Sequence, residues 1–115
     1  LLNWNRELWL IDHGASLYFH HNWNNWQSHL SRTFPRIKDH VLLPKASKLQ
    51  EAADDIKQVL SKSKLDEIVA QIPTDWLIEE TDDLSPDEKR AAYQAFLHSR
   101  LDKIDELQKE AADAR

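Results

Sequence analysis

Residues 85–112 read SPDEKRAAYQAFLHSRLDKIDELQKEAA, and this stretch decides the fold class. Ser85 is a favourable helix N-cap, Pro86 suits the first helical position, and Glu88 completes a capping box. Apolar side chains then recur at helical spacing on one stripe, which comprises Tyr93, Phe96, Leu97, Leu101, Ile104, Leu107 and Ala111. The pattern predicts a single long helix that ends near residue 112.

Two further amphipathic segments precede this helix. Residues 45–60 carry one apolar stripe, made of Leu49, Ala52 or Ala53, Ile56 and Leu60. Residues 65–72 carry another apolar face, with Ser63 as the expected N-cap and Pro73 as the stop. Both segments therefore favour helices.

The connection to Ser85 contains a short apolar turn and an acidic run. Residues 73–77 predict a short helical turn with Trp76 packed inward, and residues 79–83 predict a solvated acidic loop.

Residues 1–44 differ in composition from the rest of the chain. They hold four of the five tryptophans and five of the six histidines, with four basic against three acidic residues. Residues 45–115 hold eleven basic against seventeen acidic residues. The first part is rich in side chains that form binding surfaces, and the second part is typical of amphipathic helices.

Short apolar runs at residues 1–4 and 8–11 predict a β-hairpin with the three-residue loop Asn5-Arg6-Glu7. Residues 22–31 place Trp23, Trp26 and Leu30 at the spacing of a short helix. We expect the four tryptophans of this region to be core residues with satisfied N–H groups, and a stacking platform for a base or sugar is the alternative. These four are Trp4, Trp9, Trp23 and Trp26. The expected architecture is mainly α, with four to six helices and a short amino-terminal hairpin.

Composition excludes several classes of protein. The 115 residues correspond to one domain, and the absence of cysteine excludes disulfides, thiolate zinc sites and a cysteine nucleophile. A net charge of −5 argues against non-specific nucleic-acid binding, and no apolar run is long enough to span a bilayer. We expect a cytoplasmic protein. Because the chain begins with Leu1 and has no methionine, we also expect a piece of a longer protein.

One motif points to chemistry. An apolar run from Leu8 to Ile11 ends in Asp12, and His13 and Gly14 follow. A strand end holds a carboxylate rigidly, and the glycine lets the backbone turn away, as in sites where an Asp binds a Mg²⁺ that bridges nucleotide phosphates. The alternative is an Asp and a Gly that simply form a turn.

Residues 1–4 and 8–21 resemble the metal-binding segment of bacterial HipA-like kinases, and Asp12-His13-Gly14 resembles the Asp-Phe-Gly triplet of kinase folds, with histidine in place of phenylalanine. Residues 34–44 and 72–77 resemble the C-terminal region of the same family. The helix that contains Ala91-Ala92-Tyr93 and Arg100-Leu101 does so too, so the likeness extends along most of the chain.

The resemblance implies the C-terminal part of a kinase-like lobe. Asp12 would be the Mg²⁺ ligand of a Mg²⁺-ATP site, and His13 and Gly14 would shape the turn beside the nucleotide. The catalytic Asp, the loop Asn and the phosphate-binding Lys would lie upstream, so the isolated chain is expected to be inactive. The implied partners are the upstream kinase lobe of the same polypeptide, a protein or small-molecule phosphate acceptor and a second copy of the chain. Neither nucleic acid nor a membrane is expected.

Other interpretations remain open. The acidic amphipathic residues 45–115 also fit a non-catalytic helical protein-interaction module. His20 and His21, with His13 and His29, are candidate ligands of a transition metal, against a simpler role as polar or cleft-lining residues. A basic cluster would bind a phosphate or an acidic substrate, or else form a solvated loop. It comprises Arg32, Arg36, Lys38 and His40.

Overall fold

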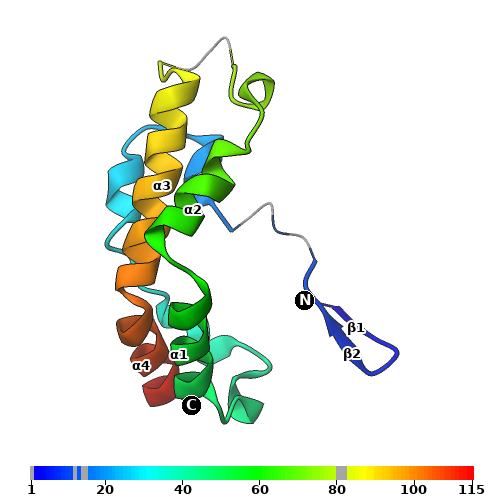
Figure 1. Ribbon diagram of the computed structural model, residues 1–115. Coiled ribbons are helices and arrows are strands. Elements are labelled where there is room, and N and C mark those ends of the chain that lie inside the picture. Colours follow the sequence, from blue (N-terminus) through cyan, green and yellow to red (C-terminus); the bar gives the residue numbers. More distant parts are fainter. Residues whose placement is uncertain (1, 12, 14–15, 80–82) are drawn as a thin grey trace.

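The computed structural model describes residues 2–11, 13, 16–79 and 83–115. A two-stranded hairpin comes first, short 3-10 helices follow, and α-helices make up most of the remainder (Figure 1). The prediction of a mainly helical protein with a short amino-terminal hairpin is confirmed.

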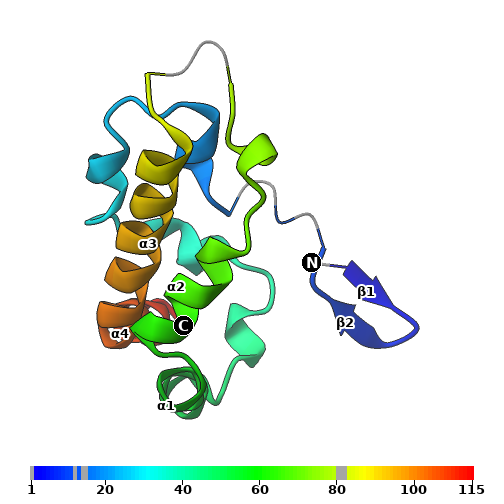
Figure 2. The same cartoon turned by 45° about the horizontal axis from the view of Figure 1, so that its top comes forward.

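Four α-helices of the described chain form two pairs. Helix α2 (Lys62–Ala70) packs along α3 (Pro86–Asp102), and α1 (Leu49–Val59) packs along α4 (Ile104–Ala114). The α1–α4 pair lies at the end of the α2–α3 pair where α3 is followed by α4, and its helices run in a different direction, since α1 is seen end-on in the view that shows α3 from the side (Figures 1 and 2). Between the hairpin and α3 lie 3-10 helices at Tyr18–His21, Trp26–His29, Pro35–Asp39, Leu43–Lys45 and Thr74–Trp76.

The hairpin pairs β1 (Leu2–Trp4) with β2 (Glu7–Trp9) in antiparallel register, with Leu2 opposite Trp9 and Trp4 opposite Glu7. Asn5 and Arg6 both have positive φ, at 52° and 67°. Two positive φ angles are what a two-residue type I′ turn requires. The predicted three-residue loop is therefore wrong, because Glu7 belongs to the second strand. In both views the hairpin stands apart from the helices (Figures 1 and 2).

The core lies between α2, α3 and the segment that follows the hairpin. Phe19 is 1% exposed, and its ring centroid lies 5.1 Å from that of Phe96 and 5.6 Å from that of Tyr93. Trp23 and Trp26 pack partly buried against this cluster, which also includes Val69 and Leu77. Aromatic pairs at these separations add to the free energy gained from burying apolar area.

The predicted core tryptophans divide into two groups. Trp23 and Trp26 contact the core as expected, whereas Trp4 and Trp9 are 61% and 51% exposed on the hairpin. The prediction that Trp76 packs inward is also wrong. Its helical turn forms as predicted, but Trp76 is 80% exposed and the next residue, Leu77, enters the core instead.

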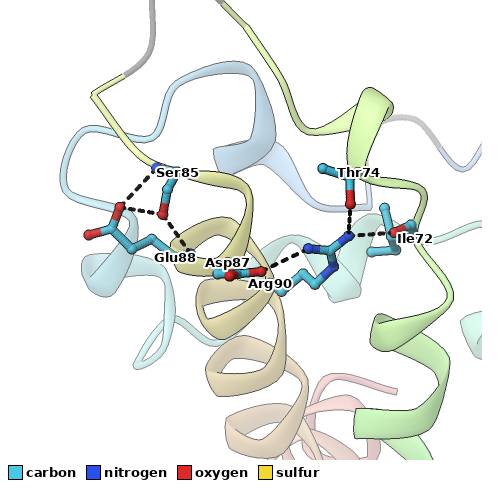
Figure 3. Close-up of polar contacts among 6 residues, drawn as sticks. All are labelled: Ile72, Thr74, Ser85, Asp87, Glu88 and Arg90. Atoms are coloured by element: carbon cyan, nitrogen blue, oxygen red, sulfur yellow. Dashed lines mark hydrogen bonds and ion pairs between the residues drawn. The ribbon is translucent and has the colours of Figure 1, made fainter.

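The predicted start of α3 is confirmed, with a complete capping box at Ser85 (Figure 3). The Ser85 N–H donates to Glu88 Oε2 at 2.8 Å, and the Glu88 N–H donates to Ser85 Oγ at 3.3 Å. One turn later, Arg90 Nη2 donates to the carbonyl oxygen of Ile72 and to Thr74 Oγ1, both at 2.9 Å. These bonds tie the first turns of α3 to the segment that leaves α2.

The single long helix predicted from the apolar stripe is broken at Lys103, between α3 and α4. The last turn of α3 is bound to the backbone of residues 29–32. Ser99 Oγ donates to the Leu30 carbonyl at 2.7 Å, and Lys103 Nζ donates to the Ser31 carbonyl at 3.3 Å. These tertiary bonds, together with the packing of α4 on α1, accompany a change of helix direction that the local sequence does not indicate.

Three other boundaries differ from the predictions. Leu60 and Ser61 are extended, so the N-cap of α2 is Ser61, whose side chain accepts from the Lys64 N–H, and not Ser63. Helix α1 begins at Leu49 rather than at residue 45, because Pro44 belongs to a separate 3-10 turn. Of the helix predicted at residues 22–31, only Trp26–His29 is helical, after Asn25 in a left-handed conformation.

Among the described residues, no helix combines the length and the apolar character needed to cross a bilayer.

Candidate functional site

Two of the three predicted site residues, Asp12 and Gly14, lie outside the described residues. The structure describes the chain on both sides of them. Strand β2 ends at Trp9, and exposed residues Leu10 and Ile11 continue from it. His13 is exposed, and its carbonyl accepts from the Ser16 N–H at 2.9 Å. The predicted triplet thus connects the hairpin to the segment that carries Phe19 into the core.

The carboxylate of Asp12 is a type of ligand that Mg²⁺ prefers. Mg²⁺ takes oxygen ligands and is usually held by one or two carboxylates together with substrate phosphates, so a carboxylate after a strand is a suitable donor. In the parts of the chain that the structure describes, no three side chains of His, Asp or Glu come together as a possible metal site.

The predicted histidine cluster comes together only in part. The rings of His20 and His21 lie edge to face at 4.0 Å between centroids, and burial together with the charge of His21 lowers the pKa of His20. His29 instead lies beside the Phe19 ring, at 6.0 Å between centroids. The described histidines thus face different surroundings.

The predicted basic cluster is dispersed. Arg36 is exposed and forms an ion pair of 4.0 Å with Asp39, and His40 Nδ1 accepts from the Leu42 N–H. Lys38 faces a depression beside α4, together with Lys109 and Glu110. Arg32 lines a different cavity, of about 330 Å³, together with His29 and Arg100. Arg100 could not be assigned to this group from local sequence patterns, since 68 positions separate it from Arg32.

A second cavity, of about 430 Å³, opens between α2, α3 and the Thr74–Trp76 turn. Its walls are mainly apolar and are formed by Ile68, Ile72, Trp76, Leu77 and Tyr93, with His20 also lining it. The exposed ring of Trp76 therefore borders an apolar hollow. The direction predicted for the Trp76 side chain is wrong, because helical spacing does not say which of two adjacent apolar residues faces the core.

The hairpin and the two residues that follow it expose several large apolar side chains. They are Leu2, Trp4, Leu8, Trp9, Leu10 and Ile11. Side chains of Leu2, Trp4 and Trp9 share one face of the two-stranded ladder, and Leu8 lies on the other. Exposed apolar patches of this kind mark interaction surfaces, and an isolated two-stranded hairpin is only marginally stable in water.

Neither the family models, nor the curated proteins, nor the solved structures compared with the chain gave a match.

Proposed function

We propose that this chain is the C-terminal part of a HipA-like kinase, which transfers the γ-phosphoryl group of ATP to a hydroxyl group of a protein or small molecule. The observation that carries the proposal is the hairpin whose second strand leads directly to Asp12-His13-Gly14. Its uncovered apolar faces are suited to packing against the upstream kinase lobe of the same polypeptide.

In this proposal Asp12 is the ligand of a Mg²⁺ that would neutralise charge on the β- and γ-phosphates when bound. Described segments precede and follow Asp12 in the sequence, and each is held by contacts of its own. On one side, the β1–β2 ladder orients the strand that precedes it. On the other, the 2.9 Å bond from the Ser16 N–H to the His13 carbonyl and the burial of Phe19 hold the chain that follows it. His13 and Gly14 would shape the turn between these two segments.

The proposal is tested by an Asp12→Asn substitution in the complete parent polypeptide. We expect transfer of the γ-phosphoryl group to fall by about two orders of magnitude or more, because the substitution removes the charged metal ligand. Asp39→Asn is the matched control, since Asp39 is an exposed carboxylate of the same region and forms a long ion pair, of 4.0 Å, with Arg36. A parent that keeps its activity after the Asp12 change would contradict the assignment.

A non-catalytic helical interaction module is the second candidate, and the apolar cavity beside Trp76 favours it. Such a module would bind an apolar segment of a protein partner, and Trp76→Ala would weaken that binding while Asp12→Asn would leave it unchanged. In the kinase proposal, Asp12→Asn would lower phosphoryl transfer and Trp76→Ala would leave it unchanged. The two substitutions in one parent therefore separate the candidates.

A further inference from the structure

Two arginines line one cavity on the side of α3 that faces the amino-terminal segment. The cavity has a volume of about 330 Å³ and is lined by Ser16, Tyr18, His29, Arg32, Phe34 and Arg100, above the buried rings of Phe19 and Phe96. Its volume lies at the lower end of the range of small-molecule sites, about 300–1,000 Å³. The surrounding segments come from both ends of the chain, so the site exists only in the folded protein.

Arg100 is held rigidly at this cavity. Its Nη2 donates to the His29 carbonyl at 2.9 Å, and its Nη1 donates to the Arg32 carbonyl. Its guanidinium carbon lies 4.8 Å from the centroid of the Phe96 ring. A guanidinium has five N–H donors, so these two bonds leave donors for a ligand. A fixed, partly buried cation of this kind binds an anion with little further loss of side-chain entropy.

Arg32 adds a second cation, and few of its N–H donors are used by other protein groups. Its guanidinium makes one long bond, from Nη2 to Ser28 Oγ at 3.4 Å. Within the described residues, neither arginine forms an ion pair with a carboxylate. Glu110 accepts a bond from the Phe34 N–H but does not line the cavity. The two positive charges are therefore available to an anion.

The pKa of the His29 side chain is affected by the same two arginines. Burial lowers the pKa of His29, and the charges of Arg32 and Arg100 lower it further. An anion bound between the arginines would offset their charges.

The rim of the cavity is aromatic. Tyr18 and Phe34 both line it and are at least half exposed, so their ring faces are accessible to the organic part of a ligand. Arginine pairs suit phosphate oxygens, because the planar fork of a guanidinium matches two oxygens at once. We propose that this cavity binds a small phosphate monoester, with its phosphate at Arg32 and Arg100 and its organic group against Tyr18 and Phe34. The proposal does not depend on kinase activity.

The test is a titration of the chain with phenyl phosphate and, separately, with inorganic phosphate, followed by nuclear magnetic resonance at constant ionic strength. We expect saturable shifts at Tyr18, Arg32 and Arg100, and tighter binding of phenyl phosphate than of inorganic phosphate. Arg32→Gln should weaken phenyl phosphate about tenfold, since it removes a charge-assisted donor. Equal affinity for the two ligands would overturn the assignment of the aromatic rim.

Arg36→Gln is the matched control, because Arg36 is an exposed arginine four positions away that does not line the cavity. It should leave the affinity unchanged. Equal losses from Arg32→Gln and Arg36→Gln would overturn the proposal, since they would indicate diffuse electrostatic attraction to the surface. No loss from Arg32→Gln would overturn it as well.

A second readout follows the ring protons of His29, assigned with a His29→Gln variant. Bound phenyl phosphate should raise the pKa of His29, since the phosphate opposes the arginines and Tyr18 is the one other ionisable side chain lining the cavity. An unchanged titration would overturn the location of the site. These experiments do not involve Asp12, so their failure is distinguishable from failure of the kinase proposal.

Discussion

Trp4 and Trp9 of the amino-terminal hairpin lie in solvent, whereas Trp23 and Trp26, some fifteen to twenty residues further along, pack against the core of the helical body (residues 16–79 and 83–115). The same side chain therefore has opposite surroundings in adjacent regions. In the helical body, the segment after the hairpin packs on α2 and α3, and together they bury Phe19, Tyr93 and Phe96. In the hairpin, every residue of the two three-residue strands is exposed. The difference teaches that residue type alone does not identify a core in this chain.

The largest effect should come from the most buried aromatic side chain of the helical body. Phe19→Ala removes a ring that is 1% exposed and contacts Trp23, Tyr93 and Phe96. We expect the free energy of unfolding to fall by about 3–5 kcal/mol, as for other buried phenylalanines. Chemical denaturation followed by circular dichroism measures it.

The matched control for this prediction is Trp9→Ala in the hairpin. Because Trp9 is half exposed and lies apart from the body, we expect a change below about 0.5 kcal/mol. Comparable losses from Phe19→Ala and Trp9→Ala would break the distinction between the two regions, because they would mean that the hairpin packs on the body in solution.

An intermediate effect should follow from loss of the cap on α3. Ser85→Ala removes the acceptor of the Glu88 N–H and should lower the free energy of unfolding by about 1 kcal/mol. Ser63→Ala is the control, since Ser63 lies inside α2 and is not its cap. Thermal unfolding compares the two variants, and a larger loss from Ser63→Ala would contradict the assignment of the caps.

A smaller and purely local effect is expected in the hairpin turn. Arg6 has a φ of 67°, which is unfavourable for a residue with a Cβ, so Arg6→Gly should stabilise the hairpin by about 0.5–1 kcal/mol. Cross-strand nuclear Overhauser effects between Leu2 and Trp9 should strengthen, and the unfolding of the helical body should not change. A parallel rise in the stability of the body would show that the two regions are coupled.

The smallest effect concerns pH. Hydrogen bonds from the Ser85 backbone and side chain lower the pKa of Glu88 below its ordinary value of 4.5. The stabilisation it provides is complete above the unfolded-state pKa and is lost as pH falls through the lower folded-state pKa. The difference in stability between the native chain and Glu88→Gln should therefore shrink as pH is lowered through this range. Unfolding curves from pH 6 downward measure it, and a difference that grows towards low pH would contradict the sign.

The features predicted correctly from the sequence are those fixed by local chemistry. The capping box at Ser85 needs only residues three positions apart, and the hairpin needs only two apolar runs and a short turn. The loop length was wrong because the sequence Asn5-Arg6-Glu7 does not show which two residues adopt positive φ.

The features missed depend on distant residues. The break at Lys103 has neither glycine nor proline, and it coincides with bonds from Ser99 and Lys103 to the backbone near residue 30. The meeting of Arg32 with Arg100 has the same cause, because packing of the amino-terminal segment on α3 brings them together. Local sequence patterns predict neither the break at Lys103 nor the meeting of Arg32 with Arg100. For the candidate metal site, the sequence supplied the motif at Asp12, which stays a prediction.

The break at Lys103 also has a mechanical consequence. It divides the helical body into the α2–α3 pair, which contains the aromatic core, and the α1–α4 pair, whose buried side chains include Ala53 and Ala111. Lys57 of α1 forms an ion pair of 2.8 Å with Asp105 of α4. Ion pairs between exposed groups such as these contribute little to the free energy of unfolding. Amide hydrogens of α1 and α4 should therefore exchange with solvent through a partial opening that leaves α2 and α3 closed, so the molecule would loosen from its carboxyl-terminal end.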